Sequence, residues 1–335
     1  METHETDVVV IGGGSAGCAA AYRLLREWHD DVILVEAGSD FGPAESGRWP
    51  IDLLDIREDV GDAHDWGYEE ILPDGSAAPR SLARVIGGCS AHNNAGAAWG
   101  LPSDYDHWAE VLGEQGWSYT APRPLFDRIE NAQPPSAFRG LGGSLPTAPY
   151  AGTLSPCSEV FMAAARQAGL PELSDLSDPA PMGGVARWHL NVRGTTCWNA
   201  AFAFLDPLRG DRRLRILENL LTDRLLFNGD RAVAVRCLRD NDGQVLIRAE
   251  RFIVTAGAMG TPQILLRSGI GPAEQLAAFG IPIVSDLQGV GKHLQDHVSV
   301  DITYTLTRRR QESSPRQRTT TARSFLKWSR AGRIR

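Results

Sequence analysis

The chain has 335 residues, of which 42% are hydrophobic and 22% are charged, and its formal net charge at pH 7 is −7. This composition is that of a soluble globular protein, and the acidic balance argues against nucleic acid as a partner. No apolar run approaches the roughly 20 residues of a membrane span, and the short acidic N-terminus does not resemble a signal peptide. The five cysteines form no C-x-x-C pair, which favours a reducing compartment without structural zinc or disulfides. We therefore expect a cytoplasmic protein of one large or two modest domains.

The chain begins with a buried strand followed by three spaced glycines. Val8–Ile11 is the β-branched run typical of a parallel strand. Gly12, Gly14 and Gly17 follow at the G-x-G-x-x-G spacing, and small residues open a helix behind them. In such a turn the first glycine permits the bend, the second lets a pyrophosphate approach, and the third lets the helix pack on the strand. The pattern predicts dinucleotide binding; the alternative is a glycine-rich turn that only packs.

A second strand is followed by an acidic residue at the sequence spacing expected of a ribose-binding acid. Val32–Val35 reads as a buried strand and ends at Glu36, which lies 19 residues after Gly17. A carboxylate near this spacing is expected to hold the 2′-hydroxyl of a ribose. Because it would repel a 2′-phosphate, the sequence favours FAD or NAD over NADP.

Two further stretches suggest a binding surface. Residues 39–80 are rich in loop-forming residues, and within them Trp66 is interpreted either as a wall of a substrate pocket or as a packing contact at its rim. Arg84–Gly96 contains paired glycines and small polar residues, which suit a backbone lying against a flat ring system. Asp104 is expected to cap the start of a helix.

The second half of the chain predicts an antiparallel meander and a return to the parallel sheet. Segments between 214 and 247 cluster β-branched residues and are joined by Asn- and Asp-containing glycine turns. Phe252–Thr255 is expected to rejoin the parallel sheet. Thr261 and Pro262 are then expected to begin a helix as N-cap and first residue. An amphipathic helix is expected around 158–168.

The histidines give no metal signature. His189 stands alone, and we expect it to be packed or exposed rather than catalytic. His293 and His297 are four residues apart, but Leu294 occupies the position where the H-E-x-x-H motif needs glutamate. We therefore expect no metal site.

Six segments, in order and with family-like spacing, resemble the glucose-methanol-choline (GMC) family of FAD-dependent oxidoreductases. They are residues 7–17, 65–68, 87–90, 104–108, 257–271 and 289–297. The likeness extends from residue 7 to about 303, and it is greatest to the choline-oxidising branch of the family. A match of this length is far more specific than any single motif.

The resemblance implies FAD as the cofactor and assigns residues to it. The pyrophosphate, ribose, adenine and flavin contacts would come from Gly12, Gly14, Ser15, Ala16, Gly17, Glu36, Ala37, Arg84, Gly88, Ser90, His92, Asn93, Thr222, Ala256 and Gly257. Thr222 would bind the adenine through its backbone. The candidates for the substrate pocket are Trp66, Asn94 and His297.

His92 has a more particular expectation. The run Gly-Gly-Cys-Ser-x-His-Asn is similar to that of the choline-oxidising branch, in which the matching histidine is bonded covalently to the flavin. The resemblance therefore implies a histidyl–FAD link through His92; the alternative is a histidine packed near the ring without a bond. Ser299 stands where that branch has a carboxylate for the trimethylammonium group, which weakens choline as the substrate.

The expected fold class is α/β: a Rossmann-like FAD-binding domain with a parallel sheet and an inserted antiparallel meander, plus an incomplete α+β substrate domain. Residues 1–306 form the GMC region, and 307–335 are expected to be a basic tail, disordered or from a non-native reading frame. The expected FAD-domain pieces are 1–40, 80–120 and 195–300, and the substrate-domain pieces are 41–79 and 121–194.

The resemblance implies oxidation of the CH–OH group of an alcohol, with hydride passing to flavin N5 and electrons then passing to oxygen or a redox carrier such as mycofactocin. The family's catalytic histidine pair is expected beyond the end of this chain, as in a truncated protein, so no catalytic residue is assigned. The alternatives are a non-catalytic FAD-binding remnant and a lyase that uses FAD structurally. Association into a homodimer is left open.

Overall fold

The computed structural model describes residues 2–150, 152, 154–179, 183–239 and 243–296. His297, Ser299 and the basic tail therefore lie outside the described residues. Residues 1–292 form one compact unit. In the described part of the chain, every helix is too short or too polar to cross a membrane.

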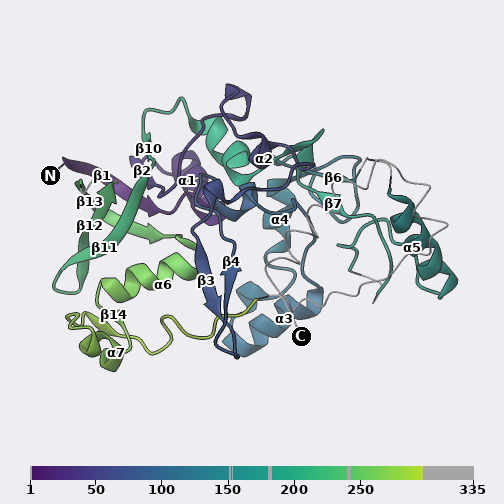
Figure 1. The fold of residues 1–335 in the computed structure, drawn as a ribbon. Helices are drawn as coiled ribbons and strands as arrows, with labels where there is room; N and C mark the ends of the chain where they lie inside the picture. Colours follow the sequence, from purple (N-terminus) through teal and green to yellow (C-terminus); the bar gives the residue numbers. More distant parts are fainter. Residues whose placement is uncertain (1, 151, 153, 180–182, 240–242, 297–335) are drawn as a thin grey trace. The chain divides into compact units, whose positions relative to one another are not determined.

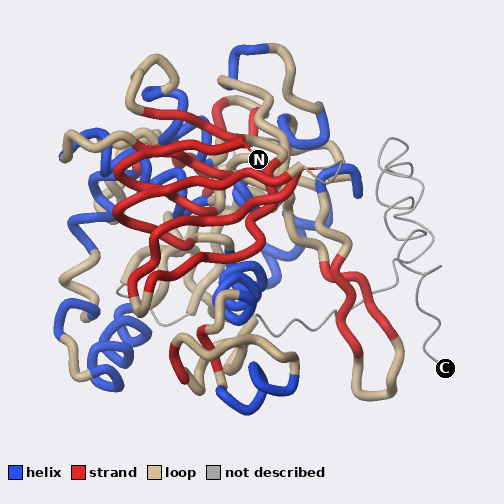
Figure 2. The backbone as a smooth tube through the Cα atoms, turned by 90° about the vertical axis from the view of Figure 1, so that its left-hand side faces the viewer, coloured by secondary structure: helices blue, strands red, loops and turns tan. Residues whose placement is uncertain are grey.

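The largest sheet of this unit has six strands, in the order β10-β2-β1-β13-β12-β11 (Figure 1), and Figure 2 shows its strands side by side. The strands are β1 (Glu2–Ile11), β2 (Val32–Val35), β10 (Leu214–Leu217), β11 (Leu220–Asn228), β12 (Arg231–Arg239) and β13 (Gln244–Val254). The first four in spatial order pair in parallel, whereas β13, β12 and β11 pair antiparallel. The predicted parallel sheet with a meander is confirmed.

The meander differs from the prediction in two respects. Leu214–Leu217, which was expected to belong to the meander, is β10 and pairs in parallel with β2 at the opposite edge of the sheet, so the meander begins with β11. The second difference concerns the end of the meander. Its last strand and the strand that rejoins the parallel sheet are one continuous element, β13, which pairs with β12 at its start and with β1 along most of its length. The charged residues between the two predicted segments, Arg248–Arg251, concealed this continuity.

Alternate residues of the central strand face two different cores. Val8 and Val10 pack on one side of the sheet with helix α1 (Ser15–Glu27) and the π-helical turn Ala201–Leu205. Val9 and Ile11 pack on the other side with the meander. All four side chains are essentially inaccessible to solvent, and burial of each stabilises the fold by about 1.5–3 kcal/mol.

A second group of elements is built around the three-stranded sheet β5-β6-β7. Its strands are β5 (Glu130–Ala132), β6 (Leu145–Pro149) and β7 (His189–Leu190), and its longer helices are α3 (Pro102–Leu112), α4 (Arg123–Ile129) and α5 (Pro156–Gln167). The helix expected around 158–168 is thus present as α5, which is capped by the Ser155 hydroxyl accepting a 3.1 Å hydrogen bond from Ser158 N–H.

The remaining elements are short, except for helix α6. The helical ones are η1 (Ala44–Ser46), α2 (Ile51–Leu54), η2 (Asp62–His64), η3 (Gly88–Ala91), η4 (Gln115–Trp117), η6 (Asp206–Leu208), α6 (Gly257–Arg267) and α7 (Ala273–Ala278). The strands are β3 (Tyr68–Ile71), β4 (Ala77–Arg80), β8 (Val192–Arg193), β9 (Thr196–Cys197), β14 (Ile270–Gly271) and β15 (Ser285–Asp286).

One predicted helix start was wrong. Helix α6 begins at Gly257 with Ala256 as its N-cap, so Pro262 lies inside the helix and costs it one backbone hydrogen bond. Helix α3 begins at Pro102, and Asp104 in its first turn caps it as expected, by accepting a 2.8 Å hydrogen bond from Leu101 N–H. The supposedly irregular stretch 39–80 also contains the hairpin β3–β4.

Candidate dinucleotide-binding site

The fingerprint turn has no room for a side chain at Gly12 or Gly17, because backbone atoms lie too close to both. A Cβ on Gly17 would lie 1.9 Å from the carbonyl oxygen of Gly12, and one on Gly12 would lie 2.6 Å from that of Thr255. Gly12 also has φ +101°, a conformation that favours glycine. The Thr255 hydroxyl donates to the carbonyls of Ile11 and Gly12 at 3.0 Å each. Sequence reasoning missed Thr255, although it ends a predicted strand beside the fingerprint.

The second glycine-rich loop faces the fingerprint directly. A Cβ on Gly88 would lie 2.7 Å from the Cα of Gly14, and Gly87 N–H donates a 2.7 Å hydrogen bond to the Gly13 carbonyl. Gly87 and Gly88 both have positive φ values, +88° and +55°. Two loops separated by about 70 residues, each predicted to contact the cofactor, are thereby brought together.

Glu36 completes this arrangement from the end of β2. Its Oε2 accepts a 2.8 Å hydrogen bond from Gly13 N–H and its Oε1 accepts one of 2.7 Å from Gly38 N–H. Burial raises the pKa of Glu36, although these two N–H groups oppose the shift. The acid therefore lies beside the fingerprint, where the sequence predicted a ribose contact.

Several other predicted residues lie open to solvent. Ser15, Ala16, Asn93, Asn94 and Gly257 are all exposed. They border the closed turns and are accessible to a ligand, so their assignment stays a prediction.

Two predicted polar residues have partners within the protein. The Ser90 hydroxyl donates to the Gly87 carbonyl at 2.6 Å and accepts from Ala200 N–H at 2.9 Å. The Asn93 side-chain oxygen accepts a 2.8 Å hydrogen bond from Ala95 N–H. These two side chains therefore stabilise the conformation of the loop, and their contacts with the cofactor stay a prediction.

Thr222 lies on β11 next to a register shift of the meander, and its hydroxyl is 3.6 Å from the Cys237 sulfur. The hydroxyl is thus engaged inside the sheet. A contact of Thr222 with adenine through the backbone stays a prediction.

Trp66 packs against another predicted site residue. The Arg84 guanidinium lies 5.3 Å from the centre of the Trp66 ring, and Arg84 Nε donates to the Ala37 carbonyl at 3.2 Å. Trp66 also stacks on Tyr68, with ring centres 5.8 Å apart. These contacts agree with the packing interpretation of Trp66, and a substrate contact stays a prediction.

His92 has an acidic neighbour that sequence reasoning did not assign to the site. His92 Nε2 lies 4.0 Å from Asp65 Oδ2, and both side chains are 13% exposed. Asp65 begins the segment 65–68, which resembles the family, and it lies immediately before Trp66, so its position in the sequence could have pointed to the site.

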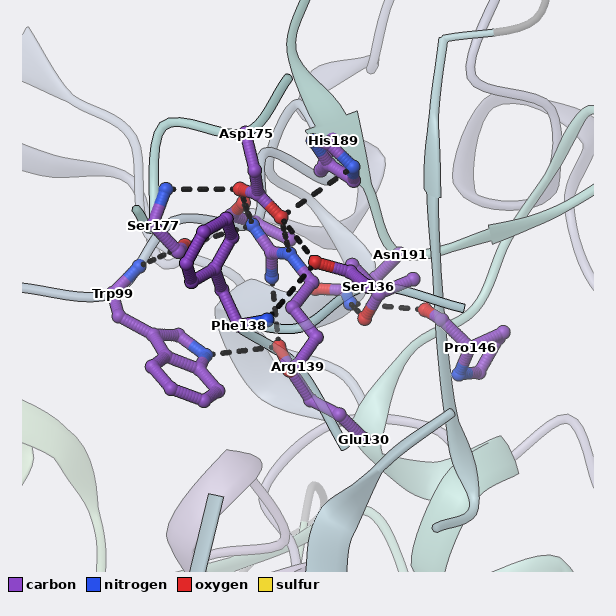
Figure 3. A network of polar contacts seen from close by, with 12 residues as sticks. Trp99, Glu130, Ser136, Phe138, Arg139, Pro146, Asp175, Ser177, His189 and Asn191 are labelled. Carbon is purple, nitrogen blue, oxygen red and sulfur yellow. Dashed lines mark hydrogen bonds and ion pairs between the residues drawn. The ribbon is translucent and has the colours of Figure 1, made fainter. Parts of the chain in front are cut away.

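A buried polar network surrounds Arg139 (Figure 3). The Arg139 side chain is fully buried; it donates to both oxygens of Asp175, at 2.6 and 2.9 Å, and to Glu130 Oε1 at 2.9 Å. It also donates to the Ala97 carbonyl at 2.8 Å, which ties the segment that follows Asn94 to the smaller sheet. His189 joins the network, with Nε2 3.6 Å from Asp175 Oδ2. His189 is thus packed, as expected.

The described residues contain no group of three or more His, Cys, Asp or Glu side chains arranged to hold a metal ion.

Comparisons with known proteins agree with this geometry. The family model described as GMC oxidoreductase matches residues 6–299. The chain is 35% identical over 313 residues to an uncharacterized GMC-type oxidoreductase from the thcA 5′ region of Rhodococcus erythropolis, covering 90% of this chain and 61% of that protein. It is also 35% identical over 310 residues to the oxygen-dependent choline dehydrogenase of Yersinia pestis, covering 90% and 54%.

Solved structures give the same result. Pyridoxine 4-oxidase from Mesorbium loti superposes with a TM-score of 0.76 at 31% identity, covering 84% of this chain and 55% of that one. Aspergillus oryzae formate oxidase superposes with a TM-score of 0.78 over 89% and 53%, but at 23% identity this is a likeness of fold alone. The chain spans little more than half the length of these relatives. From the match over residues 6–299, the chain belongs to the GMC oxidoreductase family.

Proposed function

We propose that this chain binds FAD and belongs to an enzyme that oxidises the CH–OH group of an alcohol. The observation that carries the proposal is the contact between the two glycine loops at Gly14 and Gly88, beside the buried Glu36. Relatives named choline dehydrogenase and pyridoxine 4-oxidase support an alcohol or a related small molecule as the substrate.

The residues present fit FAD. The backbone at Gly14 is open on the ligand side, because a Cβ there would meet only the Gly88 Cα, at 3.8 Å. The N-terminus of α1 suits a pyrophosphate, since its free N–H groups and dipole favour negative charge. In this proposal Glu36 and Ala37 hold the adenosine ribose and Thr222 the adenine.

The flavin end would be held by residues of the second loop and of the α6 turn. Arg84, Gly88, Ser90 and Asn93 would contact the flavin and pyrophosphate, together with Ala256 and Gly257. Bound FAD supplies the hydride acceptor. The chain's own residues bind and orient it, and the loops limit access of water. Asn94, Trp66 and His297 remain the candidates for contact with the substrate.

We also propose that His92 carries the flavin covalently. The similarity of its loop to the choline-oxidising branch supports the link, as does the burial of most of its side chain. Flavin retained in the acid-precipitated pellet would support it, and flavin released entirely into the supernatant would contradict it.

Anaerobic addition of primary alcohols to the FAD-loaded chain tests the oxidation itself. Bleaching of the flavin absorption by an alcohol is the expected result. An FAD-loaded chain that no alcohol reduces would instead indicate a protein that binds FAD without oxidising alcohols, either a remnant or a lyase. Transfer of electrons to oxygen or a redox carrier, a cytoplasmic location and homodimer formation belong to the same proposal.

A further inference from the structure

We propose that Asp65 is a positioning residue for His92: it holds the imidazole in place and stabilises the positive charge that develops when the imidazole bonds to the flavin. This inference rests on the proposed histidyl–FAD link. Nothing in the resemblance assigned a role to Asp65.

The two side chains form a pair with little access to water. Asp65 Oδ2 and His92 Nε2 are 4.0 Å apart, which is an ion-pair distance rather than a hydrogen bond, and each side chain is 13% exposed. At this distance and degree of burial, the attraction between a carboxylate and an imidazolium is several times stronger than in bulk water.

The Asp65 carboxylate is fixed by three other donors. Ser81 Oγ and Leu82 N–H donate to Oδ2 at 2.6 and 3.0 Å, and Gly67 N–H donates to Oδ1 at 2.7 Å. Burial opposes ionisation of Asp65, but these hydrogen bonds prevail and lower its pKa below the ordinary value. The group is therefore anionic at neutral pH and cannot turn away from His92 without losing partners.

The backbone around Asp65 is joined to the segment that leads to His92. Arg84 N–H donates to the His64 carbonyl at 2.7 Å, and Trp66 N–H donates to the Leu82 carbonyl at 2.9 Å. The Trp66 ring then contacts the Arg84 guanidinium. The pair of Asp65 with His92 thus follows from a backbone pairing and not from two mobile surface side chains.

The Asp65 carboxylate would stabilise a positive charge that develops on the imidazole while the link forms. Forming the bond between an imidazole nitrogen and the flavin 8-methyl carbon removes one hydrogen from each. The two protons and two electrons pass to the flavin ring, and dioxygen then takes them as hydrogen peroxide. The attacking imidazole becomes positively charged before it loses its proton, and the Asp65 carboxylate lowers the energy of that charge.

The test measures the covalent fraction of bound FAD after full-length apoprotein is incubated with FAD in air. Asp65→Asn is expected to bind FAD but to form the link roughly 10- to 1000-fold more slowly than wild type. Asp65→Glu keeps the charge and should restore most of the rate. His92→Ala should bind FAD with no link.

A control variant separates the charge of Asp65 from charge elsewhere in the neighbouring hairpin. Asp74→Asn changes a similar turn aspartate, which accepts from Ser76 in the β3–β4 turn. It should form the link at nearly the wild-type rate.

Equal rates for wild type and Asp65→Asn would overturn the role of Asp65 and leave the His92 link standing. An FAD-loaded wild type with no covalent flavin would overturn the link itself, and with it this inference. If Asp65→Asn fails to bind FAD, the Asp65→Glu variant tests the inference instead. The inference holds if Asp65→Glu forms the link, and it fails if Asp65→Glu binds FAD without forming the link.

Discussion

The Glu36 carboxylate accepts a 2.8 Å hydrogen bond from the backbone N–H of Gly13, and this bond joins the end of β2 to the middle of the fingerprint turn. The second oxygen of Glu36 is bonded to Gly38 N–H. Glu36, which is predicted to bind the ribose, therefore also stabilises the turn that would hold the pyrophosphate.

Replacing Glu36 should affect both stability and cofactor binding. Glu36→Ala leaves two buried N–H groups without acceptors, at a cost of about 1–3 kcal/mol each. Glu36→Gln keeps one acceptor oxygen and should lose less. Urea unfolding of the apoprotein and FAD titration measure the two effects; an alanine variant as stable as wild type would contradict the structural role.

The fingerprint glycines offer a matched pair of variants. Gly17→Ala places its Cβ 1.9 Å from the Gly12 carbonyl oxygen and should prevent folding or destabilise the chain by several kcal/mol. Gly14→Ala has an ordinary φ of −75° and only a 3.8 Å neighbour, so the apoprotein should lose less than about 1 kcal/mol.

Gly14→Ala should nevertheless weaken FAD binding by roughly tenfold or more, because its methyl group occupies the space of the pyrophosphate. Thermal unfolding without FAD and titration with FAD separate the two effects. Unchanged FAD affinity in Gly14→Ala would show that the ligand does not approach this turn.

The Arg139 network should make stability sensitive to the loss of one partner. Arg139→Met leaves the carboxylates of Asp175 and Glu130 buried without their cation, and should cost about 3–5 kcal/mol. Arg166→Met, which breaks the exposed pair with Glu172, serves as the control and should cost less than about 1 kcal/mol. Similar losses in the two variants would argue against the network as drawn in Figure 3.

His189 should contribute to the decline of stability in mild acid. Burial lowers the pKa of His189 below its ordinary value of 6.5, although the Asp175 carboxylate opposes the shift. Below that value the unfolded chain binds more protons than the folded one. Stability present above pH 6.5 is therefore lost as the pH falls, by up to about 1.4 kcal/mol per pH unit.

The measurement is urea unfolding at about pH 7.5 and about pH 5.5. His189→Gln should show a smaller loss than wild type between these values, whereas His29→Gln, on the surface, should behave as wild type does. An identical decline in His189→Gln would exclude this contribution.

The sequence predicted those features that depend on short-range patterns. Val8–Ile11, the three glycines and Glu36 carry the β1–α1–β2 unit in their order and spacing, and the structure has them in that arrangement. Asn228-Gly229 likewise marked the β11–β12 turn. Such patterns predict structure correctly because they depend on interactions between residues that are close in the sequence.

The Arg139 network could not be predicted in this way. Its members Glu130, Arg139, Asp175 and His189 are spread over about 60 residues, and only the folded chain brings them together. The start of α6 failed for a different reason: Thr261-Pro262 is a strong local start signal, but the turn at Gly257 begins the helix earlier.

The most direct test of the account is the absorption spectrum of the purified full-length chain after incubation with FAD and removal of free cofactor. The account predicts a yellow protein with about one flavin per chain and oxidised-flavin absorption bands at about 370 and 450 nm. It also predicts that Gly14→Ala retains much less flavin than wild type. A folded wild-type chain that remains colourless at high FAD concentration would contradict the assignment of this site to FAD.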